Sequence, residues 1–205
     1  KGIIANPNCS TIIMVMALKP IYDLAKIKRV IVSTYQAVSG AGKEGIDELD
    51  AQVRDHSEGR EMTANILPSA SAEKHYPIAF NLIPQIDVFC DNLYTKEEMK
   101  MVNETKKIME DYEMRITATT IRVPVYRSHS ESVNIELEKE VDLGAMREAL
   151  AKFPGVTVQD DPSKQEYPMP LYTSEKDDVY VGRLRRDESC EKSYNMWVVG
   201  DQIRK

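Results

Sequence analysis

Apolar residues recur at helical spacing directly after a polar Asn-Pro-Asn turn near the start of the chain. Over residues 9–29 they form a stripe that Pro20 interrupts, which predicts one kinked helix or two short ones. Thr95 and Asp142 are expected as N-cap residues, the first in a capping box with Glu98. Three further helices are predicted, at residues 46–53, 95–109 and 142–152.

Runs rich in β-branched residues or with strict alternation lie between these helices. They predict strands at residues 29–35, 117–126, 130–138, 179–181 and 196–199. In the third of these, Val133, Ile135 and Leu137 alternate with polar neighbours, which indicates one wet face. Residues 59–77 show no clean period and are interpreted as a long loop. Helices and strands mix without an internal repeat, so an α/β or α+β sheet domain is favoured.

Composition narrows the class of protein. The 205 residues are 42% hydrophobic and 29% charged, enough for a real core. The net charge of −6 with scattered basic residues argues against nucleic acid as a partner. No apolar run approaches the roughly 20 residues of a membrane span and no signal peptide is recognisable, so we expect a soluble, cytoplasmic protein without membrane contact.

Three cysteines without close spacing form neither a disulfide framework nor a metal site, which fits a reducing cytosol. Cys90 and Cys190 are interpreted as packing residues. Cys9 differs because it stands where the polar turn meets the first predicted helix. Unpaired backbone N–H groups and the positive end of the helix dipole favour the thiolate there. Asn8 precedes it, and its amide is a candidate donor to a developing oxyanion.

The run Asn6-Pro7-Asn8-Cys9-Ser10-Thr11 resembles the active-site motif of aspartate-β-semialdehyde dehydrogenases. Three later segments resemble that family in the same order: Tyr35–Gly42, Glu97–Lys100, and Arg122–Val125 continuing through His129–Ser132. Related reductases of N-acetyl-γ-glutamyl phosphate carry Gly before the cysteine and an aromatic residue after it, whereas Asn8 and Ser10 stand here. Glyceraldehyde-phosphate dehydrogenases also differ around their cysteine. The resemblance covers essentially residues 1–205.

The resemblance implies a role for each matching residue. Cys9 would be the nucleophile, His129 the acid/base and Gln36 a neighbour of the thiol. Asn8, Arg122 and Glu97 would bind the substrate, Arg122 through its α-carboxylate and Glu97 through its ammonium group. Lys100 would bind phosphate, and Ser39 and Gly40 would line the nicotinamide side. Arg127 is the competing arginine, which motif position disfavours.

Two spacings in the sequence bear on these residue roles and on nucleotide binding. Arg122 and His129 are seven apart, which on one unbroken strand would place them on opposite faces; Pro124 and the turn near Arg127 can break that parity. Residues 40–45 match G-x-G-x-x-G, but they follow the strand after the nucleophile's helix, so we interpret the match as a false lead for dinucleotide binding.

By resemblance, the whole enzyme would reduce L-4-aspartyl phosphate with NADPH to aspartate 4-semialdehyde and phosphate, through a thioester on Cys9. This is a step toward lysine, methionine and threonine. The resemblance implies a mixed, largely antiparallel sheet with helices packed on one face, and a homodimer, with further assembly into tetramers left open.

The chain matches the family's catalytic and dimerisation domain, without the N-terminal Rossmann domain for NADP and without the end of the C-terminal segment. We therefore expect no turnover from these residues alone. Two alternatives stay open, a domain that only dimerises and an enzyme like the N-acetyl-γ-glutamyl-phosphate reductases.

Overall fold

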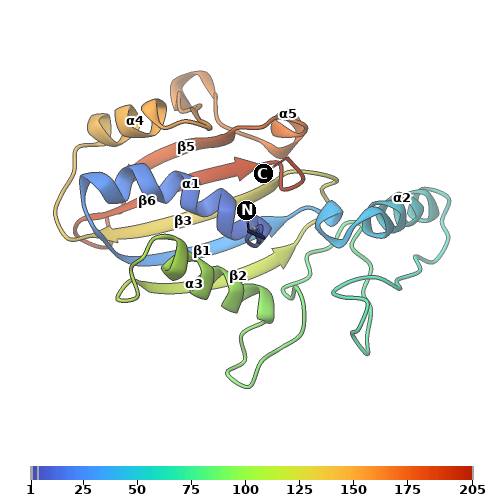
Figure 1. Ribbon diagram of the computed structural model, residues 1–205. Coiled ribbons are helices and arrows are strands. Elements are labelled where there is room, and N and C mark those ends of the chain that lie inside the picture. Colours follow the sequence, from blue (N-terminus) through green and yellow to red (C-terminus); the bar gives the residue numbers. More distant parts are fainter. Residues whose placement is uncertain (1, 4, 205) are drawn as a thin grey trace.

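The computed structural model describes residues 2–3 and 5–204. Six strands form one sheet in the order β2-β1-β3-β6-β5-β4 (Figure 1). The strands are β1 Ile27–Gln36, β2 Arg115–Arg122, β3 His129–Leu137, β4 Val156–Val158, β5 Val179–Arg186 and β6 Ser193–Gly200. Neighbours are parallel in β1–β2 and β4–β5 and antiparallel in the other three pairs. The expected mixed, largely antiparallel sheet is confirmed.

The three helices α1, α3 and α4 lie on one face of this sheet, and α2 extends beyond its edge with the irregular segment that follows it (Figure 1). The helices are α1 Cys9–Leu24, α2 Lys43–Ser57, α3 Lys96–Ile108, α4 Leu143–Lys152 and α5 Pro170–Thr173, with 3-10 turns η1 Val38–Ala41 and η2 Pro162–Lys164. Within the described ranges, no helix has both the length and the apolar composition to cross a membrane.

Short-range patterns in the sequence predicted most of these helices and strands. The capping box of Thr95 with Glu98 and the N-cap of Asp142 are both present. α1 is one helix that contains Pro20, and Pro20 is itself buried, so packing offsets the backbone hydrogen bond that proline lacks. β4 and α5 were not predicted because three and four residues are too short to show a period.

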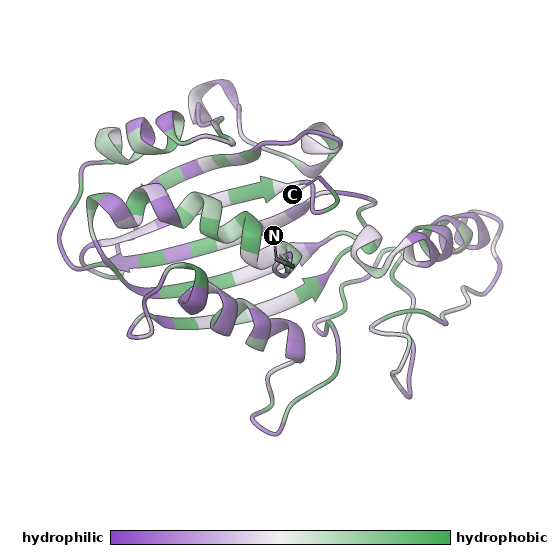
Figure 2. Ribbon diagram, in the orientation of Figure 1, coloured by the Kyte–Doolittle hydropathy of each residue, from purple (hydrophilic) through white to green (hydrophobic). Residues whose placement is uncertain are grey.

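The main core lies between α1 and the sheet. Ile13, Met14 and Leu18 of α1 are at most 1% exposed, and they pack in the same cluster as Val32 of β1 and Val133 of β3. Figure 2 shows α1 as predominantly hydrophobic, in contrast to the polar outer sides of α2 and α3. Val32 and Val133 pair directly in the antiparallel register, so each strand presents its apolar residues toward the helix.

One end of the sheet brings three strand ends together. β1 ends at Gln36, whose register partner Arg122 ends β2, while β3 begins at His129. Arg122 and His129 therefore belong to two different strands, which lie on either side of β1. The rule that residues seven apart point to opposite faces holds within one strand, so it does not apply to this pair. The start of α1 meets this end, since Gln36 Nε2 donates to Ser10 Oγ at 2.6 Å.

Candidate active site

The start of α1 is built by Asn8, the N-cap residue. Its Oδ1 accepts hydrogen bonds from the backbone N–H groups of Ser10 (3.0 Å) and Thr11 (3.1 Å). Cys9 is the first residue of the helix and is half-buried. The predicted placement of the thiol at the positive end of a helix is therefore confirmed. Cys90 is also half-buried, but Cys190 is exposed, so its interpretation as a packing residue was wrong: it lies in the turn before β6.

Glu97 of α3 is the polar centre of the site and is 6% exposed. Its Oε1 accepts from Asn8 Nδ2 at 2.8 Å and from Gln36 Nε2 at 3.3 Å, and lies 3.9 Å from Cys9 Sγ. The Asn8 amide, considered above as an oxyanion donor, thus bonds to this carboxylate. Glu98 instead serves the capping box, so the capping pattern correctly left Glu97 for other contacts.

Arg122 lies near this carboxylate, which acts on its charge, and is 3% exposed. Its Nη1 donates to the carbonyl of Ala37 at 2.7 Å, while its Nε finds no hydrogen-bond partner among the described residues. Burial lowers the pKa of the guanidinium, and the nearby charges of Cys9 and Glu97 oppose that shift. A buried guanidinium N–H without a partner is suited to donating a hydrogen bond to an anionic ligand.

Arg127, the competing arginine, is held in a separate set of contacts. It forms ion pairs with Glu175 (2.9 Å) and Asp201 (2.8 Å). Asp201 is itself buried and accepts from the backbone N–H of Glu175. Arg127 therefore stabilises the packing between these segments, whereas Arg122 lies within electrostatic range of Cys9 and Glu97.

The ring of His129 is fully buried and oriented by a backbone group. Its Nδ1 accepts from the Ala37 N–H at 3.0 Å. Because that N–H can only donate, the neutral ring carries its proton on Nε2. Gly40 is exposed beside it, and a Cβ at Gly40 would lie 3.2 Å from His129 Nε2 and 2.7 Å from Arg122 Nη1. A side chain at this position would therefore clash with the Arg122 guanidinium and press on the His129 ring.

The other glycines of the G-x-G-x-x-G match also have local steric reasons. Gly42 is the N-cap of α2 with φ +83°, a conformation that favours glycine. A Cβ at Gly45 would lie 2.6 Å from the carbonyl oxygen of Val38. Local backbone geometry therefore explains why glycine stands at these two positions of the motif, without a bound dinucleotide.

Lys100 lies at the exposed edge of the site. Its Nζ is 3.3 Å from Asp87 Oδ2 and 3.6 Å from Glu97 Oε2. Burial alone lowers the pKa of Lys100, but the two carboxylates together outweigh it and raise the pKa. The site thus carries a fixed positive charge near solvent and a second, buried positive charge at Arg122.

Comparisons with known proteins show the family to which this chain belongs. Residues 18–205 match the model of the family described as semialdehyde dehydrogenase, dimerisation domain. The chain belongs to this family. It is 55% identical over 205 residues to the aspartate-semialdehyde dehydrogenase of Aquifex aeolicus and spans 58% of that protein's length.

Solved structures of semialdehyde dehydrogenases share the fold. The aspartate semialdehyde dehydrogenase II of Vibrio cholerae, complexed with ASA, superposes with a TM-score of 0.91 at 45% identity, covering 98% of this chain and 57% of the other. The Candida albicans enzyme with NADP superposes with a TM-score of 0.68 at 23% identity, covering 98% and 52%, and shows a shared fold.

The residues singled out by the resemblance lie in two neighbouring groups. Glu97 contacts Asn8, Cys9, Gln36 and Lys100. Arg122 and His129 meet at the backbone of Ala37, beside Gly40, whereas Ser39 bonds to Gln202.

The structure also adds groups that sequence reasoning missed. These are Glu104 of α3, which bonds to the backbone of Asn8, and Asp87, which pairs with Lys100. At the other end of the site, Gln202 joins Ser39 to the backbone N–H of Ser128. For Glu104 a signal existed, because it follows Glu97 by seven residues on a predicted helix and so shares its face.

Proposed function

We propose that this chain is the catalytic and dimerisation domain of an aspartate-semialdehyde dehydrogenase. Joined to a nucleotide-binding domain, it reduces L-4-aspartyl phosphate to L-aspartate 4-semialdehyde and releases phosphate. The observation that carries the proposal is the thiol of Cys9 at a helix N-terminus, 3.9 Å from Glu97 Oε1 and close to the buried Arg122. A thiol between one fixed anion and one fixed cation suits a substrate that carries both charges.

Each end of the substrate has a matching group. The α-carboxylate binds to Arg122, whose unpaired Nε offers a buried donor. The ammonium binds to Glu97, which is buried and accepts several hydrogen bonds. The phosphate binds to Lys100, which lies toward solvent, as a leaving group requires. The reacting carbon is then held beside Cys9 Sγ.

The thiolate of Cys9 attacks the carbonyl carbon, and the carbon–oxygen bond to phosphate breaks, leaving a thioester. When bound, NADPH would supply the hydride for reduction of this thioester. When the carbon–sulfur bond then breaks, the aldehyde leaves and the thiolate is restored. His129 Nε2 faces the site beside Gly40 and holds the proton that neutralises developing charge on oxygen.

We propose NADP as the cofactor, with Ser39 and Gly40 along its nicotinamide. The steric fit supports this placement, because Gly40 is exposed and carries no side chain that would clash with Arg122 and His129 beneath it. Ser39 is 7% exposed and fixed by Gln202. The nucleotide itself would be held by the domain that the longer relatives carry in addition to these residues.

The proposed partner is a second copy of this chain, forming a homodimer. The family description as a dimerisation domain supports it. The sheet face opposite α1 also supports it, because Tyr35, Ser132 and Trp197 on that face keep exposed or half-exposed side chains. Light scattering on the chain tests the dimer, and a clean monomer at micromolar concentration would contradict it.

The substrate is tested with the longer enzyme. NADPH oxidation is followed with aspartyl phosphate and with N-acetylglutamyl phosphate, and we expect turnover with the first only. Cys9→Ala should abolish it, and retained turnover would refute the assignment of the nucleophile. In this chain alone, iodoacetamide should alkylate Cys9 faster near pH 7 than the exposed Cys190. Equal rates would support a domain that only dimerises.

A further inference from the structure

Two glutamates of α3 hold the residue that precedes the nucleophile. Glu97 and Glu104 are seven residues apart, two helical turns, so both face the start of α1. Glu97 Oε1 accepts from the side-chain amide of Asn8 at 2.8 Å. Glu104 Oε2 accepts from the backbone N–H of Asn8 at 2.7 Å. The N-cap residue is therefore bonded to α3 at both its side chain and its backbone.

The remaining groups of Asn8 form the helix cap. Its Oδ1 accepts from Ser10 and Thr11, and its carbonyl oxygen accepts from the N–H of Ile12 at 3.0 Å. Each backbone and side-chain polar group of Asn8 thus has a partner. Because the cap sets the direction of the first turn, a displacement of Asn8 displaces Cys9 as well.

The two contacts from α3 differ in how they respond to a ligand. Glu97 also contacts Cys9, Gln36 and Lys100, so a bound cation competes directly for its oxygens. Glu104 makes its one hydrogen bond to Asn8, counting only the described part of the chain, and is half-buried. Its hold on the turn is independent of the ligand.

We propose that Glu104 is a positioning residue that keeps the Asn-Pro-Asn turn and Cys9 in place while Glu97 binds the substrate. The inference rests on the proposed function of Cys9 as a nucleophile. Glu104 acts through Asn8 and touches neither the substrate nor the thiol. Its carboxylate also lies beside the N-terminus of α1, where negative charge stabilises the helix.

Glu104→Gln and Glu104→Ala separate the hydrogen bond from the charge. Both variants remove the charge, but only glutamine keeps an acceptor oxygen for the Asn8 N–H. The readout is the rate of Cys9 alkylation by iodoacetamide at pH 7, followed by mass spectrometry on this chain. We expect the alanine variant to react about fivefold more slowly than the glutamine variant, the factor that corresponds to losing one cap interaction.

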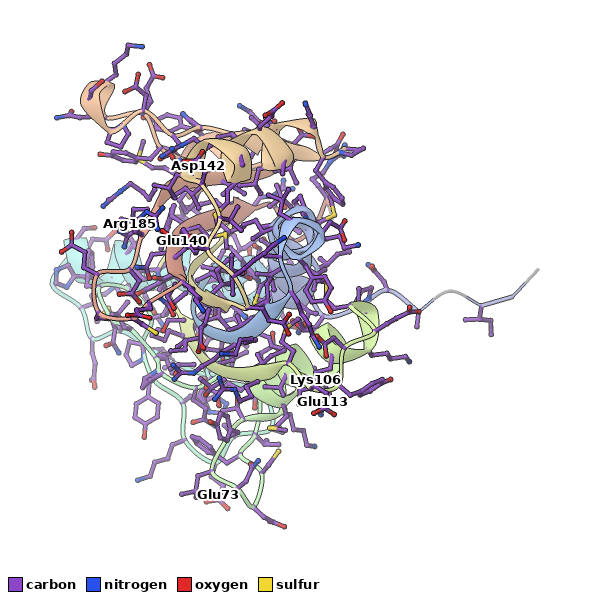
Figure 3. The ribbon with its side chains drawn as sticks, turned by 90° about the vertical axis from the view of Figure 1, so that its left-hand side faces the viewer. Glu73, Lys106, Glu113, Glu140, Asp142 and Arg185 are labelled. Carbon is purple, nitrogen blue, oxygen red and sulfur yellow. The ribbon has the colours of Figure 1, made fainter. Side chains whose placement is uncertain are left out.

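Two controls accompany this comparison. Glu113→Ala removes an exposed carboxylate just beyond α3, where Figure 3 shows its side chain at the surface, and should leave the rate unchanged. The alkylation rate of the exposed Cys190 shows whether iodoacetamide is equally active in every sample. Equal rates for the alanine and glutamine variants, with both folded by circular dichroism, would overturn the proposal, even if alanine lowers the melting temperature.

A shortened side chain covers the case in which the alanine variant fails to fold. Glu104→Asp keeps the charge but withdraws the acceptor by one methylene, so Cys9 alkylation should again be slower than in the unmodified chain. Unchanged alkylation would overturn the proposal. No substrate enters this assay, so a wrong substrate assignment leaves its result standing. An unreactive Cys9 in the unmodified chain would instead count against the proposed function.

In the longer enzyme, Glu104→Ala should lower kcat with aspartyl phosphate about fivefold relative to Glu104→Gln. KM should stay within about twofold, because Glu104 does not contact the substrate. A change confined to KM would place Glu104 in substrate binding and overturn the positioning role.

Discussion

Glu131 of β3 is a carboxylic acid without a partner in the core of the protein. It is fully buried, and neither oxygen has a hydrogen-bond partner among the described residues. Its register neighbours are Thr34 of β1 and Val198 of β6, both also fully buried. Burial raises its pKa well above the usual value, so the folded protein holds this side chain neutral.

Replacing Glu131 by methionine should therefore stabilise the chain. A buried polar group without a hydrogen bond costs about 1–3 kcal/mol, and methionine has a similar length without that cost. At pH 5, where the folded carboxyl is neutral, we expect the free energy of unfolding to rise by about 1–3 kcal/mol. For a chain of this size that corresponds to roughly 2–12 °C in melting temperature.

The pH dependence has a defined sign. The folded-state pKa of Glu131 is raised, so the unfolded chain releases this proton first and stability falls as pH rises from about 4.3 through the folded pKa. Glu131→Gln removes this slope and keeps a polar side chain. The advantage of Glu131→Met over the unmodified chain should therefore grow with pH.

Guanidinium denaturation followed by circular dichroism between pH 5 and 8 measures both effects. Glu136→Gln on the same strand is the matched control, and it should leave the slope between pH 5 and 8 unchanged. The hydrogen bond to Lys28 lowers the pKa of Glu136, so its contribution to stability is fully present in this range and is lost only at more acidic pH. If Glu131→Met destabilises the chain at pH 5, or if Glu131→Gln keeps the slope of the unmodified chain, the reasoning is refuted.

Three further predictions concern the site and the core. Gly40→Ala should lower turnover of the longer enzyme about 10- to 100-fold, measured by NADPH absorbance. The added Cβ would lie only 2.7 Å from Arg122 Nη1 and would push the guanidinium out of place, so near-normal turnover would contradict this prediction. Glu97→Gln should speed alkylation of Cys9 at pH 7 by up to about tenfold, since a carboxylate 3.9 Å away opposes the thiolate; a slower reaction would count against it. Leu18→Ala should lower the free energy of unfolding by about 2–5 kcal/mol in urea titrations, and a change under 1 kcal/mol would show that the core collapses around the gap.

Much of the fold was predictable because its signals are local. The capping box at Thr95 and the cap at Asp142 each lie within four residues of the helix they start, so they are visible in the sequence. The alternation of Val133, Ile135 and Leu137 likewise predicted a strand with one face against the core. β4 and α5 escaped because a period needs more residues than they contain.

The candidate site was predictable as a set of residues but not as an arrangement. The motif around Cys9 and its place before an apolar helix indicated a thiol at a helix N-terminus, and the resemblance to a family supplied the other members. Tertiary structure decided the rest. Strand order placed Arg122 and His129 on either side of β1, and packing of α3 beside α1 placed Glu97 and Glu104 on Asn8.

The physical reason is the range of the interactions. Caps and periods depend on neighbours within one or two turns, whereas Glu104 and Asn8 are 96 residues apart and meet only because two helices bury their apolar faces on the same sheet. The alternation of β3 does place Glu131 on the core face, together with Val133, Ile135 and Leu137. Only tertiary packing decides that no hydrogen-bond partner reaches its carboxyl group among the described residues.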